Sequence, residues 1–263
     1  MILMNMKCSI LASLALLTAV HADEPPTERS VADEAALLKK GRITAQQRAL
    51  ARLAASKDPE ADKVLLEQFA RFRAGELPPA LWLDLFEAAA KRENPEVRKT
   101  LAQREAELAA TRDPLAKFRE CLEGGDGEAG RKVFERQPDP NCIRCHTMDG
   151  KGGEIGPDLT WLRKAAERSN LLESVVSPSE QMAIGFKAAT LTLKDGTDVS
   201  GVITKETGED LVLTDVTTGK KRTIAIDDIV KRTTLPSPMP PHFGAVLSKR
   251  ELRDLIEYLA AGD

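Results

Sequence analysis

The chain has 263 residues, a formal net charge of −3 at pH 7, and 42% hydrophobic residues. This length suits one large domain or two modest ones. Its 38 basic and 41 acidic residues are interspersed, which argues against a protein held to nucleic acid by phosphate contacts. We therefore expect no nucleic acid among its partners.

Residues 1–22 have the pattern of a secretory signal peptide. Lys7 provides a basic start, an apolar run follows from Ile10 to Val20, and a small residue, Ala22, ends the segment. The apolar run is too short to span a bilayer comfortably. The pattern predicts cleavage near Ala22, a periplasmic or secreted protein, and no membrane span in the mature chain.

Residues 23–125 are predicted to form a helical region, because apolar residues recur there at helical spacing. Helix starts are indicated at Asp58-Pro59, Asn94-Pro95 and Asp113-Pro114, each a capping residue followed by proline. The first two lie about 36 residues apart, which favours a short HEAT-like array. An irregular helical bundle fits the same pattern. A glycine-rich break at residues 124–127 separates this region from a second domain, predicted at 126–263.

The second domain contains a C-x-x-C-H motif, formed by Cys142, Cys145 and His146. This spacing is the one required for covalent attachment of a c-type haem. The two thiols would form thioethers with the haem vinyl groups, and His146 would coordinate the iron from the proximal side. The motif predicts one covalently bound haem c.

Three other interpretations of the motif remain open at this stage. A zinc site would need a second ligand pair, for which only Cys121 and His242 are available in the mature chain. A thioredoxin-like motif would need a βαβ context, and a plain disulfide would leave His146 without a role. Outside these alternatives, Cys121 is expected to be a half-buried apolar thiol late in a helix.

Residues from about 186 to 233 are predicted to form a small β insertion. Apolar residues alternate in four short segments, which are separated by the turn pairs Asp195-Gly196, Thr207-Gly208 and Thr218-Gly219. Four antiparallel strands in a meander are expected, with Asp227-Asp228-Ile229 beginning the return, as a twisted sheet or barrel. This insertion would cover part of the haem or form a docking surface for a redox partner.

From residue 126 onward the order of motifs resembles a known family. The segment Gly130–Phe134 precedes the C-x-x-C-H motif, and a glycine-rich run, Gly152–Thr160, follows it. Then come Leu171–Val176, Ser237-Pro238-Met239-Pro240 and the final segment Glu251–Leu259. This order resembles the haem-binding cytochrome c domain found in planctomycetes and verrucomicrobia, which is often attached to HEAT-like repeats or to a sugar-dehydrogenase-like propeller.

The resemblance implies a mainly α fold: a class I cytochrome c fold with a small antiparallel β insertion, preceded by the HEAT-like region. Gly130 would let the first helix of this domain approach the last one, with Phe134 and Tyr258 packing where the two cross. The glycine-rich run would let backbone pass close to the porphyrin face.

The resemblance also implies two further contacts of the haem site. The carbonyl of Pro157 would accept the Nδ1 proton of His146, which fixes the tautomer of a metal-bound histidine. Trp161 would donate its indole N–H to a haem propionate, or would only fill the core.

The sixth iron ligand is expected to be Met239, which lies between two prolines before the final helix, where cytochromes c place an axial methionine. Proline stiffens such a loop enough to hold a weak thioether ligand. The rivals are Met148, too close to His146 to reach the distal face, Met182 and His242. His242 lies three residues beyond Met239 and would produce bis-histidine ligation. An open distal site is the remaining alternative.

These features together predict an electron carrier rather than an enzyme: a periplasmic monohaem c-type cytochrome that exchanges single electrons with a redox partner protein. One alternative is a cytochrome subunit committed to a periplasmic dehydrogenase complex, with the helical region as its docking arm. The other is a haem-based sensor or scaffold protein.

Overall fold

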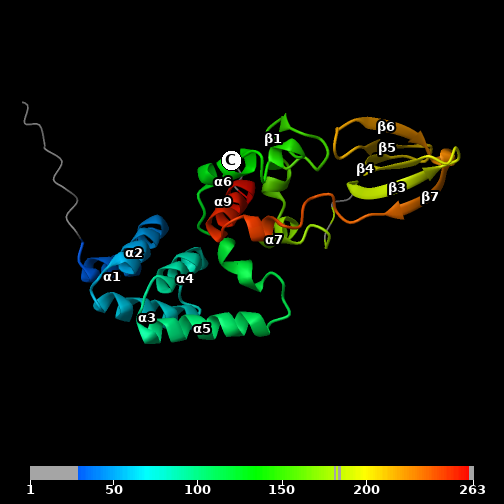
Figure 1. The fold of residues 1–263 in the computed structure, drawn as a ribbon. Coiled ribbons are helices and arrows are strands. Elements are labelled where there is room, and N and C mark those ends of the chain that lie inside the picture. Colours follow the sequence, from blue (N-terminus) through cyan, green and yellow to red (C-terminus); the bar gives the residue numbers. More distant parts are fainter. Residues whose placement is uncertain (1–28, 181, 183–184, 261–263) are drawn as a thin grey trace, which may run out of the picture.

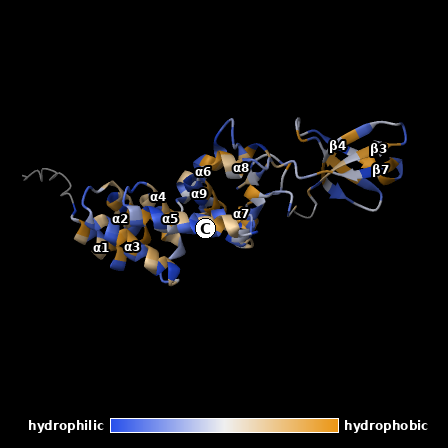
Figure 2. Cartoon of the chain, turned by 60° about the horizontal axis from the view of Figure 1, so that its bottom comes forward, coloured by the Kyte–Doolittle hydropathy of each residue, from blue (hydrophilic) through white to orange (hydrophobic). Residues whose placement is uncertain are grey.

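The computed structural model describes residues 29–180, 182 and 185–260, and the predicted signal peptide lies outside these residues. Three parts follow one another along an elongated molecule (Figure 1): a first helical unit, a second helical unit and a β-sheet. The same order is visible from a second direction in Figure 2, where hydrophobic and hydrophilic residues alternate within the helices. None of the helices in the described residues is long and apolar enough to cross a membrane.

The first unit contains five α-helices and one short 3-10 helix. They are α1 (Val31–Lys40), α2 (Ile43–Ala55), α3 (Glu60–Arg73), η1 (Pro79–Leu81), α4 (Trp82–Ala90) and α5 (Pro95–Ala110). Leu50, Leu65 and Leu81 are fully buried in a core shared by these helices. The unit is helical, as the apolar spacing predicts.

Local capping explains where two of the predicted helices begin. The side chain of Asn94 accepts hydrogen bonds from the backbone N–H groups of residues 96 and 97, and Pro95 opens α5. Asp58 accepts from the N–H of Glu60, which is the first residue of α3. The third predicted start differs, because a 3-10 helix, η2 (Ala116–Cys121), follows Asp113 in place of an α-helix. Such 3-10 segments are frequent as connectors between helices, and η2 joins α5 to α6.

The second helical unit is built around the crossing of its first and last helices. Its elements are α6 (Gly127–Glu135), η3 (Cys142–Arg144), β1 (Thr147–Met148), β2 (Lys151–Gly152), η4 (Leu162–Lys164), α7 (Arg168–Val176), α8 (Phe243–Val246) and α9 (Lys249–Ala260). A Cβ atom on Gly130 would lie 1.9 Å from the carbonyl oxygen of Asp254. The rings of Phe134 and Tyr258 lie 5.6 Å apart at the same crossing. The predicted close approach of these helices is confirmed.

The core of the second unit extends back beyond the predicted boundary at residue 126. Phe118 and Cys121, both from η2, are buried in the same cluster as Phe134 and Leu255. Cys121 is completely inaccessible, so the expectation of a half-buried thiol is wrong. The reason is tertiary, because η2 packs against α9, which is distant in sequence.

Buried ion pairs join the two helical units. Asp84 of α4 accepts hydrogen bonds from Arg250 at 3.0 Å and from Arg253 at 2.6 Å, both from α9. Glu120 of η2 pairs with Arg104 of α5 and, at 2.6 Å, with Lys249 of α9. Asp84, Glu120 and Arg253 are buried, and a buried charge that loses its partner is strongly destabilising. The two units are therefore held in one arrangement.

The β insertion is a five-stranded antiparallel sheet. Its elements are β3 (Lys187–Leu193), β4 (Asp198–Glu206), β5 (Asp210–Thr214), β6 (Lys221–Ala225), η5 (Ile226–Asp228) and β7 (Ile229–Thr234), in the order β6-β5-β4-β3-β7. The prediction of four strands is wrong by one, because β7 completes the sheet by pairing with β3. β7 is mostly exposed, so it lacks the apolar alternation that marks a half-buried strand. In the described residues β6 and β7 are the two edges, so the sheet is open.

Candidate functional site

The second helical unit encloses a cavity of about 460 Å³. Cys142, Cys145 and His146 line it, together with Met239 from the loop before α8. Apolar side chains from α6, α7 and α9 complete much of the wall: Phe134, Leu171, Val175, Leu255 and Leu259. The cavity therefore combines a few polar or sulfur-bearing groups with an apolar wall, which is the usual character of a ligand or cofactor site.

A single tight turn places the motif residues. Asn141 has a positive φ of 48° and turns the chain into η3. The backbone N–H groups of Cys145 and His146 then donate to the carbonyl of Cys142 at 3.1 and 3.0 Å. In the described residues Cys142 and Cys145 are free thiols. Because the turn is local, residue spacing alone was enough to predict that these three side chains lie together.

Burial keeps both thiols of the motif protonated at neutral pH. It raises the pKa of Cys142 to about 12 and also raises the pKa of Cys145. A protonated thiol is a poor metal ligand, since zinc is bound by the thiolate. Among residues 29–180, 182 and 185–260, no three His, Cys, Asp or Glu side chains are grouped so that they could hold a metal ion.

His146 is oriented by the backbone of the glycine-rich run. Its Nδ1 atom lies 3.0 Å from the carbonyl oxygen of Pro157, the contact that the resemblance implied. Burial lowers the pKa of His146, an effect opposed by this hydrogen bond, and favours the neutral ring. Since a carbonyl can only accept, Nδ1 carries the proton and Nε2 keeps a free lone pair. That lone pair is what a metal ion needs.

The glycines of the run pack against the motif itself. A Cβ on Gly156 would lie 2.5 Å from Cε1 of His146, and one on Gly153 would lie 2.0 Å from the carbonyl oxygen of Arg144. Gly152 also has a positive φ of 116°. The expected approach of this run to a porphyrin face stays a prediction. The observed close approach is to the imidazole and to the backbone of the motif.

The candidate sixth ligands lie in different surroundings. Met239 and Met182 both line the cavity, whereas Met148 is 3% exposed in the core and does not. Of the histidines in the described residues, only His146 lines it. The side chain of His242 is 49% exposed, and its Nε2 lies 3.6 Å from a carboxylate oxygen of Asp139.

Trp161 is 80% exposed and is not among the described residues that line the cavity. The alternative that it fills the core is therefore wrong. Leu159 and Leu162 on either side of it both line the cavity, so the chain follows the cavity wall here while the indole lies in solvent. A contact between Trp161 and a propionate stays a prediction.

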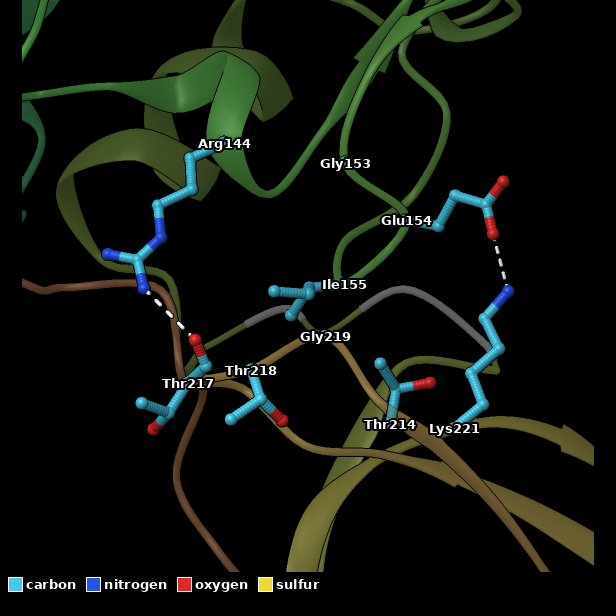
Figure 3. A pocket seen from close by; sticks show the side chains of 9 residues that line it. All are labelled: Arg144, Gly153, Glu154, Ile155, Thr214, Thr217, Thr218, Gly219 and Lys221. Carbon is cyan, nitrogen blue, oxygen red and sulfur yellow. Dashed lines mark hydrogen bonds and ion pairs between the residues drawn. The ribbon is translucent and has the colours of Figure 1, made fainter.

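Sequence reasoning did not identify the cavity residues that come from the sheet. Val202 of β4, together with Val216 and Thr217 of the turn between β5 and β6, lines the cavity. Arg144 donates to the carbonyl of Thr217 at 3.3 Å, and Lys221 pairs with Glu154. Figure 3 shows both contacts across a smaller cavity of about 380 Å³ between the glycine-rich run and this turn. No motif marks these residues, because a long-range fold brings them to the site.

The residues around the larger cavity fit a covalently attached haem. Such a group requires two free thiols, which form the thioether bonds, and one imidazole with an available nitrogen, which binds the iron. Both are present here. The side-chain oxygen of Asn141 is buried at this cavity and has no hydrogen-bond partner in the described part of the chain. Buried polar atoms are normally satisfied, so this amide is available to a polar group of a bound molecule.

Comparison with known proteins agrees with this geometry. No curated protein matches the chain. The family model for cytochrome c matches residues 127–263, which include the motif, the glycine-rich run, the sheet and the final helix. This family carries covalently bound haem c and transfers electrons through it. Because the match covers more than half of the 263-residue chain, the chain belongs to the cytochrome c family.

Proposed function

We propose that this protein is a periplasmic monohaem c-type cytochrome that carries single electrons, with His146 and Met239 as the axial ligands of the iron. The observation that supports this most is the shared cavity, which is lined by both motif thiols, the oriented imidazole and the Met239 side chain. When bound, the haem supplies an iron that changes by one electron between ferric and ferrous.

The side chains have distinct tasks in this proposal. Cys142 and Cys145 hold the group through two thioethers, and Nε2 of His146 binds the iron because Nδ1 is occupied by Pro157. Met239 supplies a thioether, a soft ligand that raises the reduction potential. The apolar wall around Phe134 and Leu255 excludes water.

Haem extraction tests the attachment. Wild-type protein made with haem-maturation machinery should keep its haem through denaturation and acid–organic extraction, and should titrate as one haem per chain. Replacing Cys142 and Cys145 together with alanine should release it. Cys121→Ala is the matched control, because Cys121 is buried in the core away from the cavity lining, and this variant should keep its haem. Zinc in place of haem in the wild type would overturn the proposal.

Spectra of three variants test the sixth ligand. Met239→Ala should abolish the sulfur-to-iron charge-transfer band and let carbon monoxide bind, and Met239→His should lower the reduction potential. His242→Ala and Met182→Ala should leave the band in place. If only Met182→Ala removes the band, Met182 is the ligand. If His242→Ala alone opens the iron, the ligation is bis-histidine.

A second candidate function is an electron-transfer subunit of a periplasmic dehydrogenase, with the HEAT-like helical region as a docking arm. The buried pairs that fix the first helical unit, including Asp84–Arg253, favour it, because a docking arm must hold its position. A subunit should co-purify with an enzyme, whereas a free carrier should elute alone. An iron that binds gases and does not cycle reversibly would favour a sensor or scaffold instead.

The proposed location has its own test. Export should give a mature protein in the periplasmic fraction whose first residue is Asp23, the residue after the predicted cleavage site. N-terminal sequencing of protein from that fraction checks both points at once.

A further inference from the structure

The β-sheet contributes directly to the wall of the larger cavity. Val202 lies in β4 and is 1% exposed, while Val216 and Thr217 lie in the β5–β6 turn, residues 215–220. All three line the cavity together with Cys142 and Cys145. The sheet is thus part of the site, although it is inserted between the segments that carry the motif and Met239.

The β5–β6 turn is held in a defined shape. The carboxylate of Asp215 accepts hydrogen bonds from the N–H of Thr217 at 3.0 Å, and from the N–H and hydroxyl of Thr218 at 2.7 and 2.8 Å. Gly219 has a positive φ of 69°, which completes the turn. Val216 is therefore presented to the cavity by a rigid turn.

Few contacts hold this turn against the motif. Arg144 donates to the carbonyl of Thr217, and Lys221 pairs with Glu154 (Figure 3). Lys221 and Glu154 are 50% and 71% exposed, and exposed ion pairs contribute little to folding stability. Substitutions at this contact should displace the turn without unfolding the protein.

We infer that the β insertion covers the haem cavity and that Val216 helps to set the reduction potential by excluding water from it. The inference rests on the proposed function. Ferric haem carries one more positive charge than ferrous haem, and a dry apolar wall disfavours the more charged form. Loosening the cover admits water, stabilises the ferric form and lowers the potential.

The sheet provides a matched pair of variants for a first test. Val216 is 38% exposed and lines the cavity, whereas Val230 of β7 is 66% exposed and does not. Potentials of full-length holoprotein are measured by spectroscopic redox titration. Val216→Asn should shift the potential downward, and Val230→Asn should leave it at the wild-type value. An unchanged potential in Val216→Asn, or equal shifts in both, overturns the inference.

The Glu154–Lys221 pair gives a second test that separates the cover from simple charge effects. If each side chain acted only through its own charge, Glu154→Gln would raise the potential and Lys221→Gln would lower it. If the pair holds the cover closed, both variants lower it. The double variant Glu154→Lys with Lys221→Glu then restores the wild-type value. Opposite shifts in the two single variants overturn the inference.

Wild-type behaviour separates this inference from the proposed function. A wild-type protein without covalent haem, or without a reversible one-electron titration, contradicts the proposed function itself. If the wild type titrates normally and the Val216→Asn variant has the same reduction potential, only the role of the sheet is contradicted. Hydrogen exchange at the amides of residues 216–219 gives a readout independent of potential, since it should accelerate in Glu154→Gln and Lys221→Gln but not in Val230→Asn.

Discussion

The imidazole of His146 is fixed by Pro157, whose carbonyl oxygen lies 3.0 Å from Nδ1. The residue before this proline, Gly156, packs directly against the imidazole ring. A Cβ at this position would lie 2.5 Å from Cε1 and 2.7 Å from Nδ1 of His146. Two consecutive residues thus position the proposed iron ligand. Pro157 accepts its hydrogen bond, and Gly156 leaves room for its ring because glycine has no side chain.

Gly156→Ala should therefore disturb iron ligation without releasing the haem. The new methyl group must push the ring aside, while both thioether bonds stay intact. We expect a changed ferric absorption spectrum with covalent haem retained, measured against Gly208→Ala. Gly208 has no heavy atom within 4 Å of a Cβ position, so this control should keep the wild-type spectrum. A wild-type spectrum in Gly156→Ala would contradict the assigned contact.

Gly130→Ala should destabilise the second helical unit. Its Cβ would meet the backbone of Asp254 at 1.9 Å, and backbone cannot move away as a flexible side chain can. Overpacking of this kind costs about 1–3 kcal/mol, more than the ~1 kcal/mol that alanine contributes to helix formation. Chemical denaturation measures the change. Gly127→Ala, in the same helix with open space around it, should be neutral or slightly stabilising.

The position of η2 predicts which fragments fold. A fragment of residues 126–263 contains the whole family match but lacks Phe118 and Cys121, both buried in its core. Each large apolar side chain removed costs about 1.5–3 kcal/mol of burial. We expect a fragment of residues 113–263 to be the more stable of the two and to retain more haem. Equal stability in denaturant would show that η2 is dispensable.

Acid should weaken the contact between α6 and α9. Glu251 caps α9 through Ser248 and accepts from Arg136, just after α6, and the hydrogen bond from Arg136 is the main reason that its pKa is lowered. A lowered folded-state pKa means that this stabilisation is present above the ordinary value of 4.5 and is lost as pH falls through the folded value.

Glu251→Gln should therefore be less stable than wild type at pH 7, by on the order of 1 kcal/mol for a partly exposed capping carboxylate. The difference should shrink as the pH falls below 4.5. Denaturation at several pH values measures it, with Glu209→Gln in the exposed β4–β5 turn as the control. A difference that stays constant with pH would contradict the assigned role.

Much of the local structure follows from the sequence alone. The turn that brings Cys142, Cys145 and His146 together spans five residues, and the start of α5 depends on Asn94 and its immediate neighbours. Such features arise from hydrogen bonds within a few residues, so spacing and residue type determine them. The strands of the sheet, apart from the exposed β7, were recognisable because successive side chains of a half-buried strand point to opposite faces, which produces apolar alternation.

Other properties were decided only by tertiary structure. The complete burial of Cys121, the exposure of Trp161, the pairing of β7 with β3 and the presence of Val216 at the cavity each depend on segments far apart in the chain. The energy of such contacts comes from apolar area removed from water when whole elements pack. No local pattern records which elements will meet. The sequence left open whether the insertion covers the haem or docks a partner, and only the folded chain shows that Val202, Val216 and Thr217 lie beside the motif.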